Sequence, residues 1–340
     1  MKPVLSILLA FIFFTTSCDK KSSGGTESNP PANLNINAVV STDNSGNVSF
    51  TATATNAVVY VFDFGDGTNQ ASATGVITHK YSSAAVYTVT VVAKNNTNQS
   101  ISKTITVNVQ KEMTLVWSDE FETAGAPDAS KWTYDIGAGG WGNNESQYYT
   151  NRPENVIVSD GTLKIIAKRE NYSGSEFTSA RMLTKGKYAF KYGKIEVRAK
   201  LPAGIGTWPA IWMLGNNFST VGWPASGEID IMEHLGRELN KIHSTLHYPG
   251  HSGGNAVGGS TTINNATTAF HKYAAEWTPG AIKFFVDDVP FYTFTNNTTL
   301  PFNQEFFIIL NVALGGNWPG PVDAAFNSST MEVDYVRVYQ

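Results

Sequence analysis

Alternation of apolar and polar residues recurs along most of the chain and predicts β-strands. Residues 194–201, Lys-Ile-Glu-Val-Arg-Ala-Lys-Leu, would place apolar and charged side chains on opposite faces of one strand. Residues 283–292 predict a hairpin that turns at Asp287-Asp288. No long stretch keeps the helical period, and Gly, Asn and Pro separate the short strands. Residues 114–340 are therefore expected to form an all-β sandwich.

A smaller all-β unit is predicted over residues 35–109. Residues 58–64 and 86–92 are rich in β-branched and aromatic side chains, which is typical of short strands. Between them, residues 64–68 read Phe-Gly-Asp-Gly-Thr, and the two glycines permit the positive φ of a turn. A chain of 340 residues has room for one large domain and one small domain.

Three motifs in the smaller unit resemble those of a PKD domain: Phe62-Asp63-Phe64-Gly65-Asp66-Gly67, His79-Lys80-Tyr81 and Val86-Tyr87-Thr88-Val89. Such a domain is a small immunoglobulin-like β-sandwich found beside many secreted polysaccharidases. The resemblance implies either weak binding of a sugar or a partner, or the role of a spacer. We expect a spacer, because the sequence offers no exposed aromatic platform for a sugar ring.

The N-terminal segment differs in composition from both units. Lys2 precedes an apolar run, residues 4–14, that is too short to span a bilayer and is typical of a signal peptide. The only cysteine, Cys18, follows directly. We predict a lipoprotein signal peptide over residues 1–17 and lipidation of Cys18, which would anchor the secreted protein to the outer membrane or cell surface. The alternative is an ordinary cleaved signal peptide with an incidental cysteine.

Residues 18–34 are predicted to be a flexible tether, because residues 19–33 contain no large apolar side chain with which to form a core.

The overall composition limits the kinds of partner that the protein can bind. The net charge of −4 leaves no basic stripe to neutralise phosphates, so nucleic acid is excluded. Eight tryptophans instead favour sugar rings, whose apolar faces stack on indoles.

One segment, residues 227–234, reads Gly-Glu-Ile-Asp-Ile-Met-Glu-His. Because side chains on a strand alternate between its faces, Glu228 and Asp230 share one face. Glu233 lies five residues after Glu228 and would face the opposite way on a regular strand. One extra residue, a β-bulge for which Met232 is the natural candidate, would bring all three carboxylates to the same face.

Three acids on one face have a chemical use. Hydrolysis of a glycosidic bond requires one ionised carboxylate and one protonated carboxylic acid flanking the anomeric carbon. Acids that lie together resist ionising together, so the pKa of one rises and its proton becomes available. A solvent-facing strand with incidental acids is the alternative, but like charges crowded on a strand are unfavourable. We therefore predict that Glu228, Asp230 and Glu233 are catalytic.

Other motifs accompany this segment in the larger unit: Trp117-Ser118-Asp119-Glu120-Phe121, Trp141-Gly142-Asn143-Asn144-Glu145, Tyr192-Gly193-Lys194-Ile195-Glu196-Val197-Arg198, Trp208-Pro209-Ala210-Ile211-Trp212-Met213, Asn311-Val312-Ala313-Leu314-Gly315-Gly316-Asn317-Trp318 and Val333-Asp334-Tyr335-Val336-Arg337-Val338-Tyr339. Together they resemble glycoside hydrolase family 16, in the branch whose catalytic strand carries the extra residue. The resemblance covers essentially all of residues 114–340. It implies a concanavalin-like jelly roll with a concave cleft and a retaining mechanism, in which Glu228 is the nucleophile, Asp230 its helper and Glu233 the acid/base.

Within that family, this branch contains β-1,3-glucanases (laminarinases), agarases and carrageenases. Residues 144–147, Asn-Glu-Ser-Gln, and 315–318, Gly-Gly-Asn-Trp, look most like those of laminarinases. Basic residues, which a sulfated chain would require, are sparse around the motifs. We expect a retaining endo-hydrolase of β-1,3-glucosidic bonds in laminarin-type β-glucans. An agarase or porphyranase type of galactan hydrolase stays open, as does an inactive surface glycan-binding protein, although a pure binder has no need for both Glu228 and Glu233.

Substrate contacts follow from the same motifs. Trp208 and Trp212 are four residues apart, hence on one strand face, and can stack on sugars. For any isolated tryptophan, core packing is the alternative. The family resemblance adds further substrate-binding residues: Asn144, Arg181, Trp223, His247 and Trp318.

Zinc and calcium are the two candidate metals, and no catalytic cofactor is expected. His243, His247 and His251 recur at a spacing that would suggest zinc on a helix, but Tyr248, Pro249 and Gly250 break any helix. The family resemblance implies instead a structural calcium ion, and oxygen ligands suit calcium. Ordinary surface acids are the alternative. We expect a monomer whose partners are its polysaccharide substrate and, through Cys18, a membrane; the matching calcium ligands are Glu120, Gly161 and Asp334.

Overall fold

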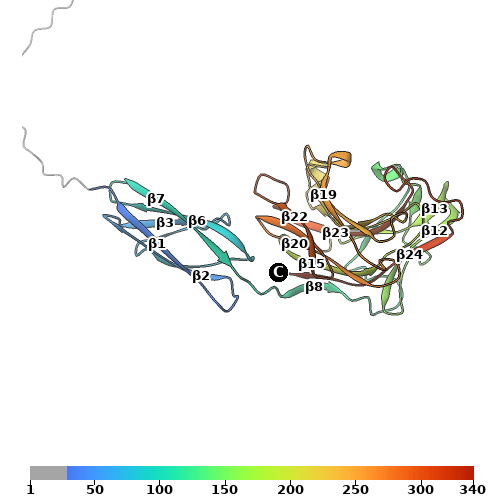
Figure 1. Cartoon of the computed structure of the whole chain (residues 1–340), viewed down its shortest axis with the longest axis horizontal. Coiled ribbons are helices and arrows are strands. Elements are labelled where there is room, and N and C mark those ends of the chain that lie inside the picture. The colour runs from blue at the N-terminus through green and yellow to red at the C-terminus, as the bar shows by residue number, and fades with distance from the viewer. Residues whose placement is uncertain (1–28) are drawn as a thin grey trace, which may run out of the picture.

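The computed structural model describes residues 29–340, which form two β-sandwich domains placed end to end along the long axis (Figure 1). The predicted signal peptide and Cys18 lie outside the described residues. None of the helices within residues 29–340 combines the length and apolar character needed to cross a membrane.

The small domain consists of a three-stranded sheet, in the order β1-β2-β5, and a four-stranded sheet, in the order β4-β3-β6-β7. β1 begins at Ala32, slightly before the expected start at residue 35, and Leu34 is already buried in the core. The strands are β1 (Ala32–Val40), β2 (Asn47–Thr55), β3 (Val59–Asp63), β4 (Asn69–Ser72), β5 (Val76–Lys80), β6 (Ala85–Lys94) and β7 (Ser100–Val109).

Aromatic side chains form the centre of this small core. Every Phe and Tyr of the domain is buried, and His79 stacks on Phe64 with 3.8 Å between ring centroids while its Nε2 lies 2.7 Å from Asp66 Oδ2. The domain therefore keeps its aromatic rings for packing and offers none of them as a surface on which a sugar could stack.

The link between the domains is short and mostly paired. On the small-domain side, the Glu112 N–H donates to the Asn44 carbonyl at 2.9 Å. On the other side, Thr114 and Gln340 exchange two main-chain hydrogen bonds of 2.9 and 3.0 Å. Only Met113 lies between these two anchored residues.

The large domain contains two curved sheets that pack face to face. The outer sheet runs β10-β13-β12-β24-β15-β20-β21-β22, with β11 paired to β12 and β8 to β24; the inner sheet runs β19-β18-β17-β16-β23-β14-β9. The outer strands are β8 (Leu115–Asp119), β10 (Gln147–Tyr149), β11 (Val156–Ser159), β12 (Thr162–Tyr172), β13 (Ser175–Ser179), β15 (Gly193–Lys200), β20 (His271–Trp277), β21 (Ala281–Val286), β22 (Val289–Thr295) and β24 (Ser328–Tyr339). The inner strands are β9 (Thr133–Asp135), β14 (Arg181–Leu183), β16 (Thr207–Gly215), β17 (Glu228–His234), β18 (Lys241–His247), β19 (Val257–Thr262) and β23 (Phe306–Leu314).

The patterns noted in the sequence are confirmed. Residues 194–200 lie in β15, which ends just before Leu201, and β21 and β22 form the predicted hairpin. Its turn residues, Asp287 and Asp288, have φ angles of 50° and 65°, as a two-residue hairpin turn requires. Helix is confined to α1 (Phe218–Val221) and the short 3-10 turns η1 (Gly140–Gly142) and η2 (Gly253–Asn255) among residues 29–340.

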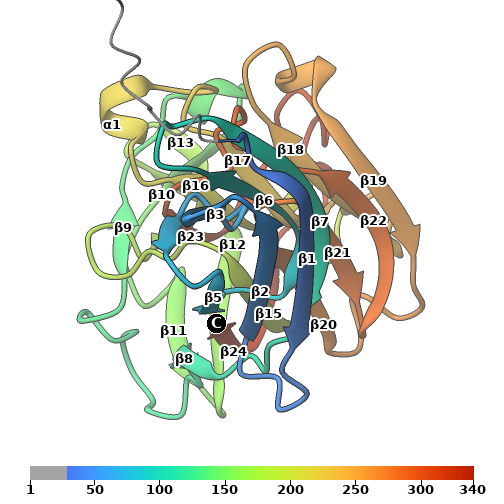
Figure 2. The same ribbon diagram turned by 90° about the vertical axis from the view of Figure 1, so that its left-hand side faces the viewer.

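The core of the large domain lies between the two sheets. Inward-facing residues of both sheets form one continuous apolar cluster, and β23 is buried along its whole length. β17 lies in the inner sheet between β16 and β18, with β19 at the edge beyond β18 and β9 at the opposite edge. In the end-on view of Figure 2, β19 and β9 lie on opposite sides of the large domain. The sheet thus holds β17 away from its own edges, with one face toward the core and the other free.

Candidate active site

The expected β-bulge is present in β17. Asp230 is opposite Thr245 of β18, and Glu233 is opposite His243, so Ile231 and Met232 together face the single residue Ser244. On the β16 side, Met232 keeps a partner and Ile231 has none. The choice of Met232 as the unpaired residue was therefore wrong in detail. Both bulge residues are buried in the core, so the side-chain pattern cannot tell which of them the neighbouring strand leaves unpaired.

The bulge separates apolar from acidic side chains. Ile229, Ile231 and Met232 pack into the core between the sheets. Glu228, Asp230 and Glu233 are the acidic members of the strand, and all three line one cavity on the opposite side of the inner sheet. The structure thus brings together the three predicted carboxylates.

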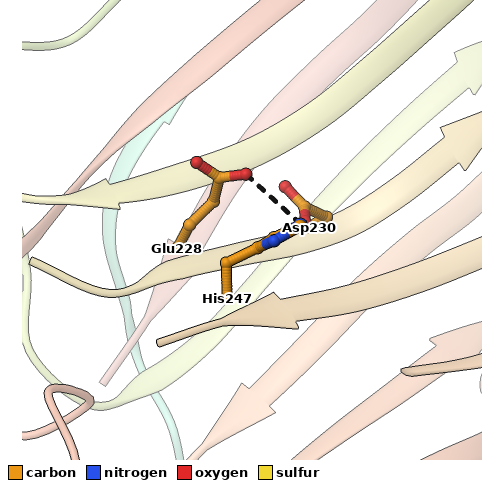
Figure 3. A group of neighbouring side chains, drawn as sticks. All are labelled: Glu228, Asp230 and His247. Atoms are coloured by element: carbon orange, nitrogen blue, oxygen red, sulfur yellow. Dashed lines mark ion pairs between the residues drawn. The ribbon is translucent and has the colours of Figure 1, made fainter. Parts of the chain in front are cut away.

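His247 approaches the first two acids from β18 (Figure 3). Its Nε2 lies 3.2 Å from Asp230 Oδ2 and 3.6 Å from Glu228 Oε1. On the other side of Glu228, the Trp223 indole N–H donates to Oε2 at 3.1 Å. The Glu228 carboxylate is therefore held between a tryptophan and a histidine.

Glu233 has its own pair of donors. The Trp208 indole N–H donates to its Oε1 at 3.1 Å, and the Thr245 hydroxyl donates to its Oε2 at 2.7 Å. Thr245 and His247 are two residues apart on β18, so both side chains face the acids.

Burial raises the pKa of all three carboxyl groups. The pKa of Glu228 rises to about 8, chiefly through burial and next through the charge of Asp230. Burial and the charge of Glu233 raise the pKa of Asp230 well above its ordinary value. Burial also raises the pKa of Glu233, against the hydrogen bonds from Thr245 and Trp208. The three groups resist ionising together, so the site binds a proton more tightly than an isolated carboxyl group does.

The group Glu228, Asp230 and His247 has the residue types of a metal site, and within residues 29–340 it is the only such group of three whose ligand atoms lie together. The hydrogen bonds of the histidine oppose this use. The main-chain N–H of Gly253 donates to His247 Nδ1 at 3.2 Å. The proton of the neutral ring therefore resides on Nε2, the ring nitrogen nearer the acids, where a metal would require a lone pair. His243, His247 and His251 do not form a ligand group either.

The acids lie in a cleft with two halves, which we name by their linings. The aromatic half is a cavity of about 480 Å³ that contains all three acids. Its other walls are large side chains, among them Trp141, Trp212, Phe218 and Phe307. The glycine half is a cavity of about 670 Å³ that contains Glu233 but neither of the other acids. Its lining includes Gly253, Gly254, Gly258, Gly259, Ser260, Lys241, His243 and Trp318.

Arg181 is central to the aromatic half. Its guanidinium lies between two indoles, 5.1 Å from the ring centroid of Trp141 and 4.7 Å from that of Trp212. Asp135, from the neighbouring strand β9, pairs with its Nε at 3.0 Å. The guanidinium is thus held in place before any ligand arrives.

A directed chain of hydrogen bonds fixes the Trp212 ring. Its indole N–H donates to Asn311 Oδ1 at 2.7 Å, and the Asn311 amide donates to the Tyr149 hydroxyl at 3.1 Å. The Tyr149 hydroxyl in turn donates to Glu145 at 3.2 Å. Burial raises the pKa of Glu145, while its own donors hold the carboxylate in position.

The proposed calcium ligands lie near one another on the outer sheet. β12 and β8 follow one another along the same side of β24, which brings Gly161 and Glu120 close to Asp334. Both oxygens of Glu120 accept hydrogen bonds from Arg337, and Asp334 Oδ2 accepts one from Arg198. Asp334 Oδ1 has no donor within residues 29–340 and is available to an ion. The oxygen donors present are of the kind that calcium takes.

Comparison with known proteins identifies the large domain. The model of glycosyl hydrolases family 16 matches residues 143–337, which include the whole acidic strand. The chain belongs to glycosyl hydrolase family 16. A second model, that of the beta-glucan synthesis-associated protein SKN1/KRE6/Sbg1, matches residues 43–229 and ends before Glu233.

Relatives within family 16 are similar over the same domain. A beta-glucanase of Rhodothermus marinus is 48% identical over 242 residues, covering 66% of this chain and 85% of that protein. A glucan endo-1,3-beta-glucosidase of Cryptopygus antarcticus is 39% identical over 248 residues, covering 66% of this chain and 90% of that protein. The solved laminarinase from Rhodothermus marinus superposes with a TM-score of 0.65 at 48% identity, covering 67% of this chain and 98% of that structure.

The family 16 cleft contains most of the residues predicted to bind substrate. Arg181 and Trp212 line the aromatic half, His247 and Trp318 the glycine half, and Trp208 and Trp223 line both. Asn144 is different: its side chain donates to Asn317 at 2.8 Å, and its neighbour Asn143 lines the cleft instead.

Sequence reasoning missed several residues of the cleft. Thr245 lies on the same strand face as the two histidines His243 and His247, so period-two alternation could have found it. Trp141, Glu145 and Asn311 were inside quoted motifs without a role. Asp135, which lines the cleft, and Tyr149, which is buried behind its wall, act through contacts between segments far apart in the chain.

Proposed function

We propose that this family 16 enzyme is a retaining endo-hydrolase of β-1,3-glucosidic bonds in laminarin-type β-glucans. The observation that carries the proposal is the bulged strand, which presents Glu228 and Glu233 together, with Asp230 between them, in a cleft. The cleft continues on both sides of Glu233, so a polysaccharide can extend in both directions and be cut internally.

In the first step, the Glu228 carboxylate attacks the anomeric carbon. Glu233 gives its proton to the leaving oxygen as that C–O bond breaks, and a covalent glycosyl-enzyme forms. In the second step, Glu233 takes a proton from water, the water attacks the same carbon, and Glu228 leaves. Both substitutions invert the carbon, so the β-configuration is retained overall.

Hydrogen bonds in the resting cleft favour ionisation of both glutamates, because each accepts from a tryptophan. The bound sugar distinguishes them. Positive charge that develops on its ring favours the ionised form of Glu228 beneath it, and the protonated form of Glu233 faces the leaving oxygen. Burial and the charge of Glu233 raise the pKa of Asp230, and a protonated Asp230 would not repel the Glu228 carboxylate.

Product analysis tests this proposal. Laminarin, mixed-linkage glucan and agarose are digested side by side, and internal cleavage of laminarin is the expected result. NMR of the first product should show the β-anomer, because a nucleophile in place of water gives retention. Cleavage of agarose alone would favour the galactan hydrolase, and binding without cleavage would favour a glycan-binding protein.

We infer that the small domain is a PKD-like spacer on a lipid-anchored protein. Its buried aromatics and its nearly fully paired link to the large domain support a spacer over a sugar-binding module. The anchor would be Cys18 after removal of residues 1–17. Radiolabelled palmitate incorporated by the wild type and lost in Cys18→Ser tests the anchor, and a protein without label would refute it.

We also infer that the enzyme acts as a monomer and that a calcium ion stabilises its outer sheet. Asp334 would supply a carboxylate oxygen, with Glu120 and Gly161 completing the site. Calcium should raise the melting temperature of the wild type and leave that of Asp334→Asn unchanged. Equal responses in both proteins would refute this site. Sedimentation velocity checks the monomer.

A further inference from the structure

The positions of the acids assign a direction to the cleft. The leaving oxygen that Glu233 protonates belongs to the sugar on the aglycone side, whereas the sugar attacked by Glu228 lies on the glycone side. Glu228 and Asp230 line only the aromatic half, and Glu233 lines both halves. The aromatic half therefore holds the glycone, and the glycine half holds the aglycone.

The two halves differ in the room that they leave around a glucan chain. In the aromatic half, Trp141 and Trp212 flank a fixed arginine, and Phe218 and Phe307 add further large rings. Such walls suit the flat faces of unsubstituted sugars. A glucose branch attached to a sugar bound in this half would have to displace an indole.

The glycine half is the larger of the two, and the residues of β19 that line it are small. Gly258 lies opposite Thr245, whose hydroxyl donates to Glu233, and Ser260 lies opposite His243. At the rim, Cβ atoms added to Gly253 or Gly254 would meet no atom within 4 Å. Open space thus lies at the rim, around Gly253 and Gly254, and the cavity continues from there past Gly258 and Ser260 to Glu233.

We propose that the glycine half admits a β-1,3-glucan whose residues carry glucose side chains on O6, whereas the aromatic half admits only unbranched glucose residues. In a β-1,3-linked chain the primary hydroxyl at C6 projects away from the backbone, so a branch there needs space beside the chain rather than along it. This inference rests on the proposed β-1,3-glucanase function.

Branched laminarin with single O6-linked glucose side chains provides the first test. Limited digestion by the full chain is followed by mass spectrometry and linkage analysis of the fragments. Glucose branches should occur near the new non-reducing ends of the fragments, because these ends leave from the glycine half. Glucose branches should be absent near the new reducing ends, which leave from the aromatic half. Branches near both kinds of end, or only near the reducing ends, would overturn the inference.

A filled glycine half provides the second test. Gly254 has open space around it and an ordinary φ, so Gly254→Phe places a ring at the rim without backbone strain. The ratio of kcat/KM on branched laminarin to kcat/KM on linear β-1,3-glucan oligosaccharides should fall at least about tenfold, as expected when a pocket loses room for a group. Gly280→Phe is the matched control, because Gly280 also has open space and an ordinary φ, in the turn between β20 and β21.

These outcomes separate the two proposals. Equal loss on both substrates in Gly254→Phe, or no loss on either, would overturn the branch inference and leave the β-1,3-glucanase function in place. Failure of the wild type to cut linear β-1,3-glucan would instead refute the proposed function itself.

Discussion

Replacement of Glu228 by glutamine should stabilise the large domain at alkaline pH while it abolishes catalysis. Glu228→Gln keeps the shape of the side chain and removes its ionisation. The Glu228 side chain is only 16% exposed, and burial together with the charge of Asp230 raises the pKa of its carboxyl from 4.5 to about 8. The native enzyme thus contains an acid that resists the charge it must carry in the reaction.

The direction of the effect follows from proton binding. Below about pH 4.5 the carboxyl is protonated in both the folded and the unfolded chain, and its ionisation does not affect stability. Between pH 4.5 and about 8 the unfolded chain releases this proton and the folded chain keeps it, so the wild type loses stability as pH rises. The variant has no such proton and escapes this loss.

The magnitude follows from the same shift. A rise of this size corresponds to roughly 5 kcal/mol if Glu228 titrated alone. Asp230 and Glu233 share the proton exchange, so we expect about 2–4 kcal/mol between pH 4 and pH 8.5. For a domain of this size, that difference is about 4–12 °C in melting temperature.

Tryptophan fluorescence is the appropriate assay, because all eight tryptophans lie in residues 114–340 and report on the large domain alone. Melting curves of the wild type and Glu228→Gln are compared from pH 4 to pH 8.5. Glu154→Gln, which changes an exposed acid on the loop before β11, is the control and should follow the wild type. A variant advantage that stays constant or shrinks as pH rises would refute the reasoning.

Three further predictions follow from the site and the link. Thr245→Val removes the hydroxyl that donates to Glu233, which should raise the pKa of that acid. The alkaline limb of the pH profile of kcat/KM should then move upward by roughly half to one pH unit, and an unmoved limb would show that Thr245 does not tune Glu233. Deletion of Met232 should leave a folded sheet but re-aim Glu233, so activity on β-1,3-glucan should drop sharply while the tryptophan fluorescence stays native-like; retained activity would show that the bulge is dispensable. Removal of residues 1–112 should leave turnover on soluble laminarin nearly unchanged, and a large loss would show that the small domain shapes the cleft.

Local periodicity was sufficient to place the acids. The alternation in β17 required one extra residue between Asp230 and Glu233, and the strand has it. It could not fix which residue is unpaired, because Ile231 and Met232 are both apolar and both buried. The partner of each depends on the register of β16 and β18, which no pattern within β17 encodes.

The aromatic half was harder to predict for a related reason. Arg181 of β14 is opposite Asn311 of β23 on one side and Asp135 of β9 on the other. Three segments far apart in the chain thus meet at one guanidinium. Each residue is unremarkable within its own segment, so only the sheet order reveals that they form one wall.

Asn144 shows the limit of carrying a motif over by position. It and Asn143 are adjacent and identical, and both belong to the same motif. Asn144 has a φ of 59° and turns its amide to Asn317, which ties the loop to the segment after β23. Asn143 is then left to face the cleft and to donate to Glu145 at 3.2 Å. A left-handed residue thus decides which of two identical side chains can reach a sugar, and the backbone conformation, rather than the residue type, determines the contact.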